Sequence, residues 1–433
     1  MGCIPTKTLV GSAKAIHTAR RGAEFGFRAS DVEVDWARIR ARKDAVVASV
    51  VAGIQRGLEQ SPRIDLIRGW ARFLGPTRLE VDGRVIEADR VILASGVVPN
   101  IPEIPGLTEA GFLTNENVMD VDELPRSLVI IGGGPEGMEF GQIFHRLGVR
   151  VTVLQRRDRV LPREDEETSR ELEGILREEG IDIRTRAEPA RVDGLPGGRA
   201  AVIATIAGRE ERFEADRILV AAGRRAHEVV EIGLDAAGIE GDPQRGIQID
   251  STLRTTAPTI WAIGDVTGRM QYTHFAVYTS GLAVRNAMKG EAIPYETRRI
   301  PGAVFTDPEV ASVGLTEQEA LAQGRRIKVG KQPMRAVGRA RAIGETSGFV
   351  KFVVDADTNE PLGMHVLAHM GADLLPQGIL MMHTGSINPL QACICVHPTM
   401  SEGVKAAVVN LRPLESVATA TGDLTEQGST ERH

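Results

Sequence analysis

A cysteine close to the start of the chain lies in a sequence that favours a reactive thiol. Cys3 stands in the segment GCIPTK, residues 2–7, and a helical pattern with small residues follows it. The sequence therefore predicts that Cys3 lies at the N-terminal end of a helix, where the helix dipole and free backbone N–H groups favour the thiolate. Lys7, one turn further on, adds positive charge. The alternative is that Cys3 is only a small apolar side chain.

A glycine-rich turn has the spacing of a dinucleotide-binding site. Gly132-x-Gly134-x-x-Gly137 follows an apolar run at 127–131 and precedes a helical pattern and a second apolar run at 150–154. In such a β-turn-α-β unit the glycines allow a tight turn and close backbone approach, and the helix N-terminus faces the pyrophosphate. We therefore predict that Gly132, Gly134 and Gly137 bind a dinucleotide, against the alternative of a purely structural turn.

The end of the second apolar run bears on which nicotinamide cofactor is bound. An NAD site usually has a carboxylate there, which binds the ribose 2′-hydroxyl. This chain has Gln155, Arg156 and Arg157 instead. Two guanidinium groups without a carboxylate favour a 2′-phosphate, so NADPH is predicted over NADH. The alternative is that both arginines are simply solvated.

A histidine near the other end of the chain has the chemistry of an acid–base group for thiols. Thiol–disulfide exchange needs a thiolate nucleophile and a proton donor for the leaving thiol. His397 followed by Glu402 suits this task, because an imidazole held by a carboxylate transfers protons near neutral pH, although a lone histidine is often structural. Cys393 and Cys395 precede His397 with a spacing that puts both on one face of a strand. We expect these two cysteines to pack in a core and not to replace a redox partner of Cys3.

The remaining sequence divides into two similar halves and a third part of different character. At 433 residues the chain is long enough for about three domains. The apolar run at 91–94 ends in Ser95 and Gly96, and a run at 217–222 ends in Gly223. This repetition predicts two related halves, each with a parallel sheet and a meander, and Asp82-Gly83 predicts a hairpin turn in the first. After residue 301, short strands and helices indicate an α+β domain.

Composition and charge exclude several other classes of protein. A net charge of −6 gives no electrostatic signature of nucleic-acid binding. Three cysteines in so long a chain form no disulfide framework, so a reducing, cytoplasmic compartment is predicted. No apolar run reaches the length of a membrane span. We predict no metal site.

Together these motifs resemble those of the pyridine nucleotide-disulfide oxidoreductases, the family of dihydrolipoamide dehydrogenase, glutathione reductase and mercuric reductase. The matching segments follow the family's order along nearly the whole chain: residues 2–7, 94–96, 132–139, 220–224, 262–266, 305–314 and 397–402. The resemblance implies FAD and NAD(P)H as cofactors, with electrons passing through a cysteine centre to a small-molecule disulfide or electrophile. It also implies a homodimer, formed through the C-terminal domain.

The resemblance further assigns roles to individual residues. The implied catalytic residues are Cys3 beside the flavin, Lys7 near flavin N5, Glu139 paired with that lysine, and the His397–Glu402 dyad, which serves the partner's active site. Asp265 would hydrogen-bond the ribityl chain of the flavin. The remaining implied cofactor-binding residues are Ser95, Gly96, Gly223 and Gly264, beside the glycine turn and the segment 155–157 already described.

Two parts of the family pattern would lie before the first residue of this sequence. They are a second cysteine of the redox motif and an FAD-binding βαβ unit with its own glycine turn. We therefore expect an α/β fold with two Rossmann-like domains, the FAD one N-terminally truncated, and a C-terminal α+β dimerisation domain. The expected bounds are 1–122 and 246–300 for the FAD-binding domain, 123–245 for the NAD(P)-binding domain, 301–415 for the dimerisation domain and 416–433 for a disordered tail.

Three functions stay open on the sequence alone. The first is a homodimeric disulfide oxidoreductase that uses NAD(P)H and FAD. The second is a flavin-free, non-catalytic remnant that still dimerises and binds NADPH. The third is a flavoprotein that uses Cys3 alone to reduce small electrophiles.

Overall fold

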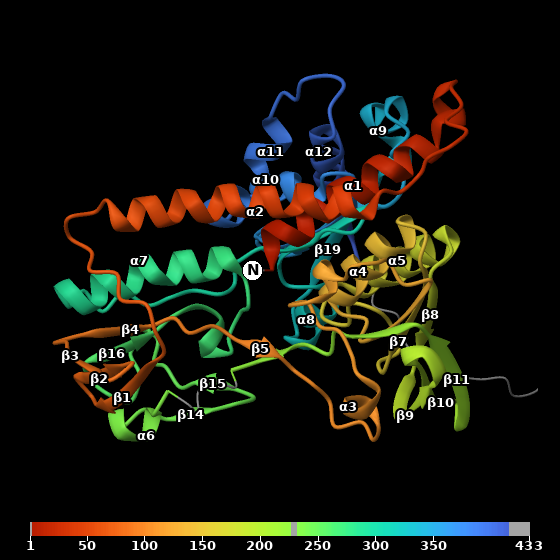
Figure 1. Cartoon of the computed structure of the whole chain (residues 1–433). Helices are drawn as coiled ribbons and strands as arrows, with labels where there is room; N and C mark the ends of the chain where they lie inside the picture. The colour runs from red at the N-terminus through yellow and green to blue at the C-terminus, as the bar shows by residue number, and fades with distance from the viewer. Residues whose placement is uncertain (1, 227–231, 415–433) are drawn as a thin grey trace, which may run out of the picture.

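The computed structural model describes residues 2–226 and 232–414, and it shows two sheet-containing halves below a pair of long helices (Figure 1). The predicted disordered tail, 416–433, lies outside the described residues. None of the described helices is long and apolar enough to cross a bilayer. The mixture of parallel and antiparallel sheets with covering helices confirms the predicted α/β fold class.

The half that carries the glycine turn, which we call the nicotinamide half after the cofactor predicted for it, is built on a parallel four-stranded sheet. Its strand order is β12-β6-β7-β8, with β6 at Ser127–Ile131, β7 at Arg150–Gln155, β8 at Asp182–Thr185 and β12 at Arg217–Val220. An antiparallel meander follows, made of β9 (Ala187–Leu195), β10 (Arg199–Ile206) and β11 (Arg209–Ala215). Helices α4 (Pro135–Arg146) and α5 (Glu166–Glu179) complete this half.

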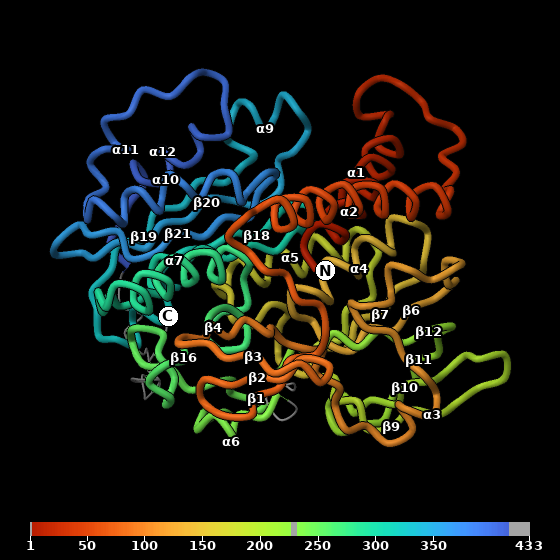
Figure 2. The backbone as a smooth tube through the Cα atoms, turned by 60° about the vertical axis from the view of Figure 1, so that its left-hand side comes forward, coloured from red at the N-terminus to blue at the C-terminus, as the bar shows by residue number. Residues whose placement is uncertain are grey.

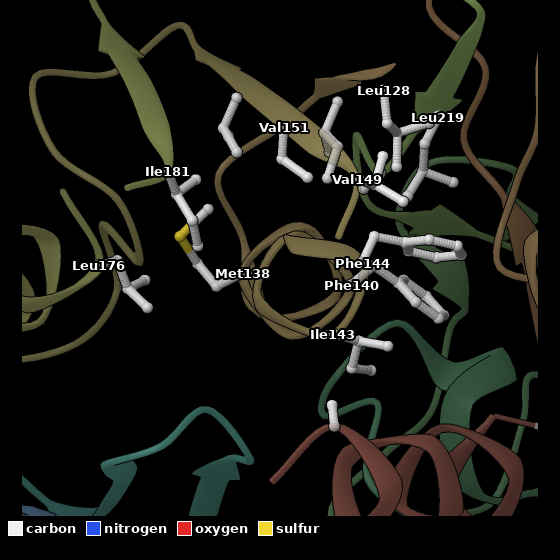
Figure 3. Close-up of a cluster of buried hydrophobic side chains, with 14 of the residues drawn as sticks. Leu128, Met138, Phe140, Ile143, Phe144, Val149, Val151, Leu176, Ile181 and Leu219 are labelled. Atoms are coloured by element: carbon white, nitrogen blue, oxygen red, sulfur yellow. The ribbon is translucent and has the colours of Figure 1, made fainter. Parts of the chain in front are cut away.

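Helix α4 lies at the centre of the largest apolar core. Figure 3 shows the side chains of Phe140 and Phe144 on one flank of the helix and Met138 on another, with Val151 on the adjacent sheet. Ile143 points from α4 towards the N-terminal helices. All of these side chains are buried, so α4 is held between the sheet and the N-terminal segment.

The N-terminal helices are α1 (Cys3–Arg20) and α2 (Trp36–Glu59). Leu9 and Ala13 of α1 are buried in the same core as the α4 side chains. Helix α2 begins at the N-cap Asp35, whose carboxylate accepts a hydrogen bond from the backbone N–H of Arg38 at 3.0 Å. These contacts fix the position of the helix that begins at Cys3.

The other half, which we call the flavin half after the cofactor that the resemblance implies, repeats the plan of the nicotinamide half with fewer strands. Strands β4 (Val91–Leu93) and β16 (Ile260–Ala262) form a parallel pair, and β1 (Ala71–Gly75), β2 (Arg78–Val81) and β3 (Arg84–Glu87) form the meander. The predicted hairpin turn is confirmed, because Asp82 and Gly83 both have positive φ angles, of 50° and 84°. Helix α7 (Thr273–Lys289) follows β16, and β5 (Val98–Pro99) pairs with β13 (Arg224–Arg225) between the two halves.

The parallel sheet of the flavin half has an open edge within the described residues. Strand β12 in the nicotinamide half pairs with β6, the strand that leads into the glycine turn, whereas β4 pairs only with β16. Ile92 of β4 is 37% exposed, and Val51 and Ile54 of α2 also expose apolar surface. The described chain therefore shows two parallel strands where the nicotinamide half has four.

The C-terminal domain is a six-stranded antiparallel sheet covered by helices (Figure 2). Its order is β17-β18-β21-β20-β19-β22, at Gly302–Val304, Glu309–Gly314, Pro361–Ala368, Phe349–Asp355, Ile327–Pro333 and Arg412–Pro413. Its helices are α8 (Glu317–Ala322), α9 (Gly338–Ala342), α10 (Gly371–Thr384), α11 (Asn388–Ala392) and α12 (Ser401–Val409). Apolar side chains of the sheet and of α10 and α12 form a separate core.

The described residues also contain several short elements. They are η1 (Gly22–Phe25), α3 (Leu107–Ala110), η2 (Val118–Asp120), η3 (Pro196–Gly198), α6 (Leu234–Ala237), β14 (Gly241–Asp242), β15 (Gly246–Ile247), η5 (Gly264–Thr267) and η6 (Met334–Ala336).

A buried ionic network joins α1, the nicotinamide half and the C-terminal domain. Arg146 at the end of α4 contacts Glu179 at 2.6 Å and Asp307 at 2.9 Å. Lys14 of α1 reaches the same aspartate at 3.0 Å. Burial alone would raise the pKa of Asp307, but Arg146 and Lys14 more than offset it and hold the pKa below its ordinary value. The carboxylate therefore stays charged and ties three parts of the molecule together.

Replacing this carboxylate should destabilise the fold and change its pH dependence. We expect Asp307→Asn to cost about 3 kcal/mol of unfolding free energy at neutral pH, because it leaves Arg146 buried with one charge partner fewer. Since the folded pKa lies below the ordinary value of 3.8, this contribution is present above 3.8 and is lost as the pH falls through the folded pKa.

Urea unfolding of the wild type and the variant over a pH series measures both effects. Asp122→Asn is the matched control, because the side chain of Asp122 is 98% exposed in its ion pair with Arg40. A stability difference for Asp307→Asn no larger than that of the control would contradict the structural role of the network.

Candidate active site

The predicted reactive thiol lies at the first residue of α1. Gly2 is the N-cap, Cys3 is exposed, and its Sγ lies 3.4 Å from Thr273 Oγ1 at the start of α7. Both helices thus begin at the same point, so their N-terminal dipole ends converge on the sulfur. This placement is the one predicted from the sequence, and it suits a thiolate nucleophile.

Lys7 and Glu139 are brought together one turn below the cysteine. Lys7 Nζ donates to both carboxylate oxygens of Glu139, at 2.9 and 2.7 Å, and it also lies over the ring of Phe305 at 4.6 Å. Glu139, only 5% exposed, accepts a further hydrogen bond from the backbone N–H of Phe305 at 2.8 Å. The ammonium is therefore held in one position by α4 and by the loop that leads into the C-terminal domain.

A second charged group lies where β16 ends. Arg224 places its guanidinium 3.6 Å from Asp265 and 3.4 Å from Glu136, and it donates to the carbonyl of Gln271 at 3.0 Å. Burial raises the pKa of Asp265 and of Glu136, and Arg224 opposes the shift in both. Glu136 stands in the first turn of α4, so this cluster joins the nicotinamide half to the flavin half.

The small residues predicted at the flavin site gather at one edge of the parallel pair. Leu93 lies opposite Ala262 in the β4–β16 register, so Ser95 and Gly96 emerge beside Gly264 and Asp265. Ligands of such sheets bind at the carboxyl ends of the strands. Gly264 has a φ of +66°, and an added Cβ there would lie 2.9 Å from Ala276 Cβ.

These residues fit the reactive end of a flavin. Asp265 offers a carboxylate to a hydroxyl-bearing chain, Lys7 offers a fixed cation, and Cys3 offers sulfur. A glycine turn that could hold the pyrophosphate of FAD does not follow β4 or β16 within residues 2–226 and 232–414.

The three glycines of the nicotinamide turn differ in how much space a side chain would have. An added Cβ at Gly132, where φ is +117°, would lie 2.2 Å from Ala221 O, and one at Gly137 would lie 2.0 Å from Gly132 O. Gly134 has nothing within 4 Å of an added Cβ and an ordinary φ of −80°. The described residues therefore give no packing reason for a glycine at position 134. The missing side chain instead leaves room for a ligand to approach the open side of the turn. The turn therefore fits a dinucleotide pyrophosphate at the N-terminus of α4.

The residues that end β7 lie beside this turn. Ile131 pairs with Leu154, so Gln155 follows next to Gly132, and its Nε2 donates to Arg159 O at 3.0 Å. Arg156 and Arg157 are exposed, and no carboxylate of the described residues lies within ion-pair distance of either guanidinium. Gly223, which has a φ of +96° and nothing within 4 Å of an added Cβ, lies three residues after the end of strand β12.

The His397–Glu402 dyad forms within the C-terminal domain, away from Cys3. His397 Nδ1 lies 3.0 Å from Glu402 Oε1, and the other carboxylate oxygen accepts from the backbone N–H of Thr399 at 2.9 Å. These two hydrogen bonds, that of His397 first, lower the pKa of Glu402. The His397 side chain is 77% exposed, and no hydrogen bond joins it to Cys3 within the part of the chain described.

The expectation for Cys393 and Cys395 was wrong. They stand in an irregular segment after α11 and not in a strand, and Cys393 is exposed while Cys395 is half-buried. The alternation of cysteine with Ile394 and Val396 resembles a strand pattern, but no strand of the described residues pairs with this segment. Without a partner strand the side chains do not enter a core.

One group of side chains has the composition of a metal site. Asp307, Glu345 and His369 bring their ligand atoms within 4.8 Å of one another. Lys14 Nζ, however, lies 3.0 Å from Asp307 Oδ1 and 2.8 Å from His369 Nδ1. The ammonium of Lys14 already supplies the positive charge that this group attracts.

Sequence reasoning missed several residues of the site. Arg224, Glu136 and Thr273 carry the contacts that join α1, α4 and α7, and none was predicted as a site residue. Arg224 directly follows Gly223 in a predicted strand end, which is the one local signal that was available. The other two act through contacts between segments far apart in the chain.

The different surroundings of Gly134 and Gly137 lead to a paired prediction. Gly134→Ala should fold normally, changing the unfolding free energy by less than about 1 kcal/mol, but weaken NADPH binding about tenfold or more because the new methyl group meets the pyrophosphate. Gly137→Ala should instead destabilise the protein by about 1–3 kcal/mol, because its Cβ meets backbone. NADPH fluorescence titration and urea unfolding separate the two effects.

Gly174→Ala on the surface of α5 is the control for that pair, since nothing lies within 4 Å of its added Cβ. If Gly134→Ala bound NADPH as tightly as Gly174→Ala, the open side of the turn would not be the cofactor site.

Comparison with known proteins agrees with this geometry. Residues 1–280 match the family described as "Pyridine nucleotide-disulphide oxidoreductase", and residues 300–408 match its dimerisation domain. The chain is 36% identical over 410 residues to a mercuric reductase of Bacillus cereus, an alignment that covers 94% of this chain and 65% of that protein. It is 36% identical over 416 residues to a dihydrolipoyl dehydrogenase of Thermus scotoductus, covering 94% and 88%.

A solved structure shows the same fold. The HOCl-induced flavoprotein disulfide reductase RclA from Escherichia coli superposes with a TM-score of 0.83 at 31% identity, covering 94% of this chain and 90% of that one. These relatives confirm the predicted enzyme class and the cofactors FAD and NAD(P)H at the level of the family. The chain belongs to the pyridine nucleotide-disulfide oxidoreductase family.

Proposed function

We propose that this chain is the subunit of a homodimeric flavoenzyme that passes electrons from NADPH through FAD to a cysteine centre. From there they reach a small disulfide or another thiol-reactive molecule. The main support for this proposal is the contact between α1 and α4. Helix α1 begins at Cys3, and its Lys7 is ion-paired to Glu139 on α4, the helix that begins at the nicotinamide turn. The thiol is therefore fixed next to the predicted nicotinamide site. A cytoplasmic location stays a prediction.

The residues around the flavin position have distinct tasks. FAD would be held beside Gly96, Gly264 and Asp265, and it would supply two-electron transfer between the nicotinamide and sulfur. Asp265 holds the hydroxyl-bearing chain, and Lys7 supplies a fixed positive charge where negative charge develops. Glu139 positions that ammonium through two hydrogen bonds and so acts through Lys7.

Cys3 acts as the nucleophile. The N-terminal ends of α1 and α7 meet at its sulfur, and their free N–H groups and dipoles stabilise the thiolate. The thiolate attacks a sulfur of the substrate disulfide, which forms a mixed disulfide and releases one thiolate that needs a proton. Two electrons, which bound reduced FAD would supply, must then break the mixed disulfide, so that the second thiol leaves and Cys3 returns to its thiolate form.

The dyad supplies that proton. Glu402 is a carboxylate with a lowered pKa, so it can only accept, and the proton on the His397 imidazole must lie on Nδ1. His397 Nε2 is then the atom that takes up a proton and delivers it to the leaving thiolate. Because the dyad is exposed and separate from Cys3 in one chain, we propose that it serves the active site of the second subunit.

A single-thiol function is the second candidate. All three cysteines are free, and the polar neighbour of Cys3 is Thr273, not a cysteine. Within the described residues, then, no second thiol stands ready to close a disulfide with Cys3. A flavoprotein that reduces small electrophiles through one thiol would need no more than this.

Anaerobic titration of the purified chain with NADPH, followed by visible absorbance, tests the proposal. We expect a bound flavin that bleaches with NADPH and recovers its colour when a small aromatic disulfide is added. Cys3→Ser should still bleach but recover at least about 100-fold more slowly, because the nucleophile is gone. Cys393→Ser makes the same chemical change elsewhere and should behave as the wild type.

The other outcomes separate the alternatives. A flavin that bleaches but is reoxidised only by quinones, and not by any disulfide, supports the single-thiol function. A chain that binds NADPH but holds no flavin after incubation with FAD rejects both enzymatic functions.

The free guanidinium groups beside the glycine turn predict the cofactor preference. Replacing Arg156 by Glu and Arg157 by Ala should raise the KM for NADPH about tenfold or more and leave that for NADH nearly unchanged, because only NADPH carries the 2′-phosphate. Steady-state kinetics with each cofactor measures this. Arg177→Ala on α5 controls for loss of surface charge, and equal losses with both cofactors would show that the arginines do not bind the phosphate.

A further inference from the structure

The loop between β7 and α5 connects the proposed NADPH site to the C-terminal domain. It begins with the exposed Arg156 and Arg157, and it ends at Asp165, the N-cap of α5, whose side chain is fully buried. The task proposed for the two arginines requires that the loop hold them at one place beside the glycine turn. The contacts that fix this loop therefore bear on cofactor binding.

The middle of the loop is bonded to the glycine turn. The backbone N–H of Leu161 donates to Gly133 O at 2.8 Å, and Leu161 has a left-handed conformation with a φ of +44°. Leu161 is 2% exposed, and its carbonyl oxygen accepts a hydrogen bond from Ser169 Oγ of α5 at 2.9 Å. A residue other than glycine keeps such a φ only where its surroundings enforce it. A shift at the start of α5 would therefore move Leu161 and, with it, the loop.

A lysine of the C-terminal domain holds the far end of the loop. Lys351 of β20 places its Nζ 2.6 Å from Asp165 Oδ1, and these two side chains are 1% and 0% exposed. The same ammonium contacts Glu317 of α8 at 2.7 Å and Glu167 of α5 at 3.1 Å. Burial alone would lower the pKa of Lys351, but Asp165 and Glu317 more than offset it, so the ammonium stays charged. Because a buried charge is costly without its partner, this contact fixes Asp165.

We propose that Lys351 is a positioning residue for the nicotinamide cofactor. Through Asp165 it fixes the loop that presents Arg156 and Arg157 to the 2′-phosphate of NADPH. Lys351 acts through this loop and not on the cofactor itself. The inference rests on the proposed function, because only an NADPH site gives the two arginines a phosphate to bind. A residue of the C-terminal domain thereby contributes to the choice of cofactor in the nicotinamide half.

Asp165→Asn tests the contact from the loop side with little disturbance of the fold. Asparagine is as good an N-cap as aspartate, so the start of α5 is retained. Lys351 also keeps the carboxylates of Glu167 and Glu317. We expect the Kd for NADPH to rise about tenfold and that for NADH to change less than about threefold, because only NADPH carries the phosphate that the arginines bind. Fluorescence titration of the full-length chain measures both constants without turnover.

Lys351→Gln tests the same contact from the other domain. Glutamine still has a hydrogen-bond donor for Asp165, which limits the cost of leaving that carboxylate buried. We expect the same selective loss of NADPH binding. The two variants change the local charge in opposite directions, so a purely Coulombic effect on the 2′-phosphate would strengthen NADPH binding in Asp165→Asn and weaken it in Lys351→Gln. A loss in both variants identifies displacement of the loop.

Glu317→Gln is the matched control, because it removes a carboxylate from the same ammonium but belongs to α8 and not to the loop or α5. It should leave both dissociation constants within about twofold of the wild type. If Asp165→Asn bound NADPH as tightly as this control, or lost affinity for both cofactors equally, the positioning role would be rejected. A wild type with equal affinity for NADPH and NADH would instead contradict the proposed cofactor preference. Far-ultraviolet circular dichroism checks that the variants fold, and Asp165→Asn decides alone if Lys351→Gln does not.

Discussion

The carboxylate of Glu139 is the contact on which the arrangement of the site depends. It is almost fully buried, and it satisfies both the ammonium of Lys7 and the backbone N–H of Phe305. Three segments far apart in the chain therefore meet at one charged group: the helix of the thiol, the helix of the nicotinamide turn and the loop into the C-terminal domain. A buried carboxylate is costly unless it is fully paired, so each of these segments needs the other two in place.

The ionic network around Asp307 extends the same constraint along α1. Lys14 lies about two turns beyond Lys7 and binds the aspartate that Arg146 also holds at the far end of α4. Helix α1 is thus fixed to α4 at two points, which leaves little freedom for the residue that begins it. A nucleophilic sulfur benefits from such fixation, because thiol exchange demands a defined line of approach.

Local signals in the sequence were sufficient for much of the fold. The glycine turn, the apolar strands around it and the Asp82-Gly83 hairpin depend on short-range conformational preferences, and the structure has each of them. The contacts of Arg224 with Asp265 and Glu136 join residues from three separate segments, which no periodic pattern reveals. The segment with Cys393 and Cys395 was predicted to be a strand because its apolar and cysteine residues alternate. A strand also needs a neighbouring strand to pair with, and the described residues provide none there.

The central claim is that each active site is shared, with Cys3 from one subunit and His397 from the other. Mixing subunits tests it most directly: Cys3→Ser protein and His397→Gln protein, each inactive as a homodimer, are unfolded together, refolded with FAD and assayed for NADPH-dependent disulfide reduction. Random pairing puts both intact residues at one site of each heterodimer, so activity should return to about a quarter of the wild-type value. Heterodimers that form, as shown by a tag on one subunit, but remain as inactive as the parent proteins would contradict the account.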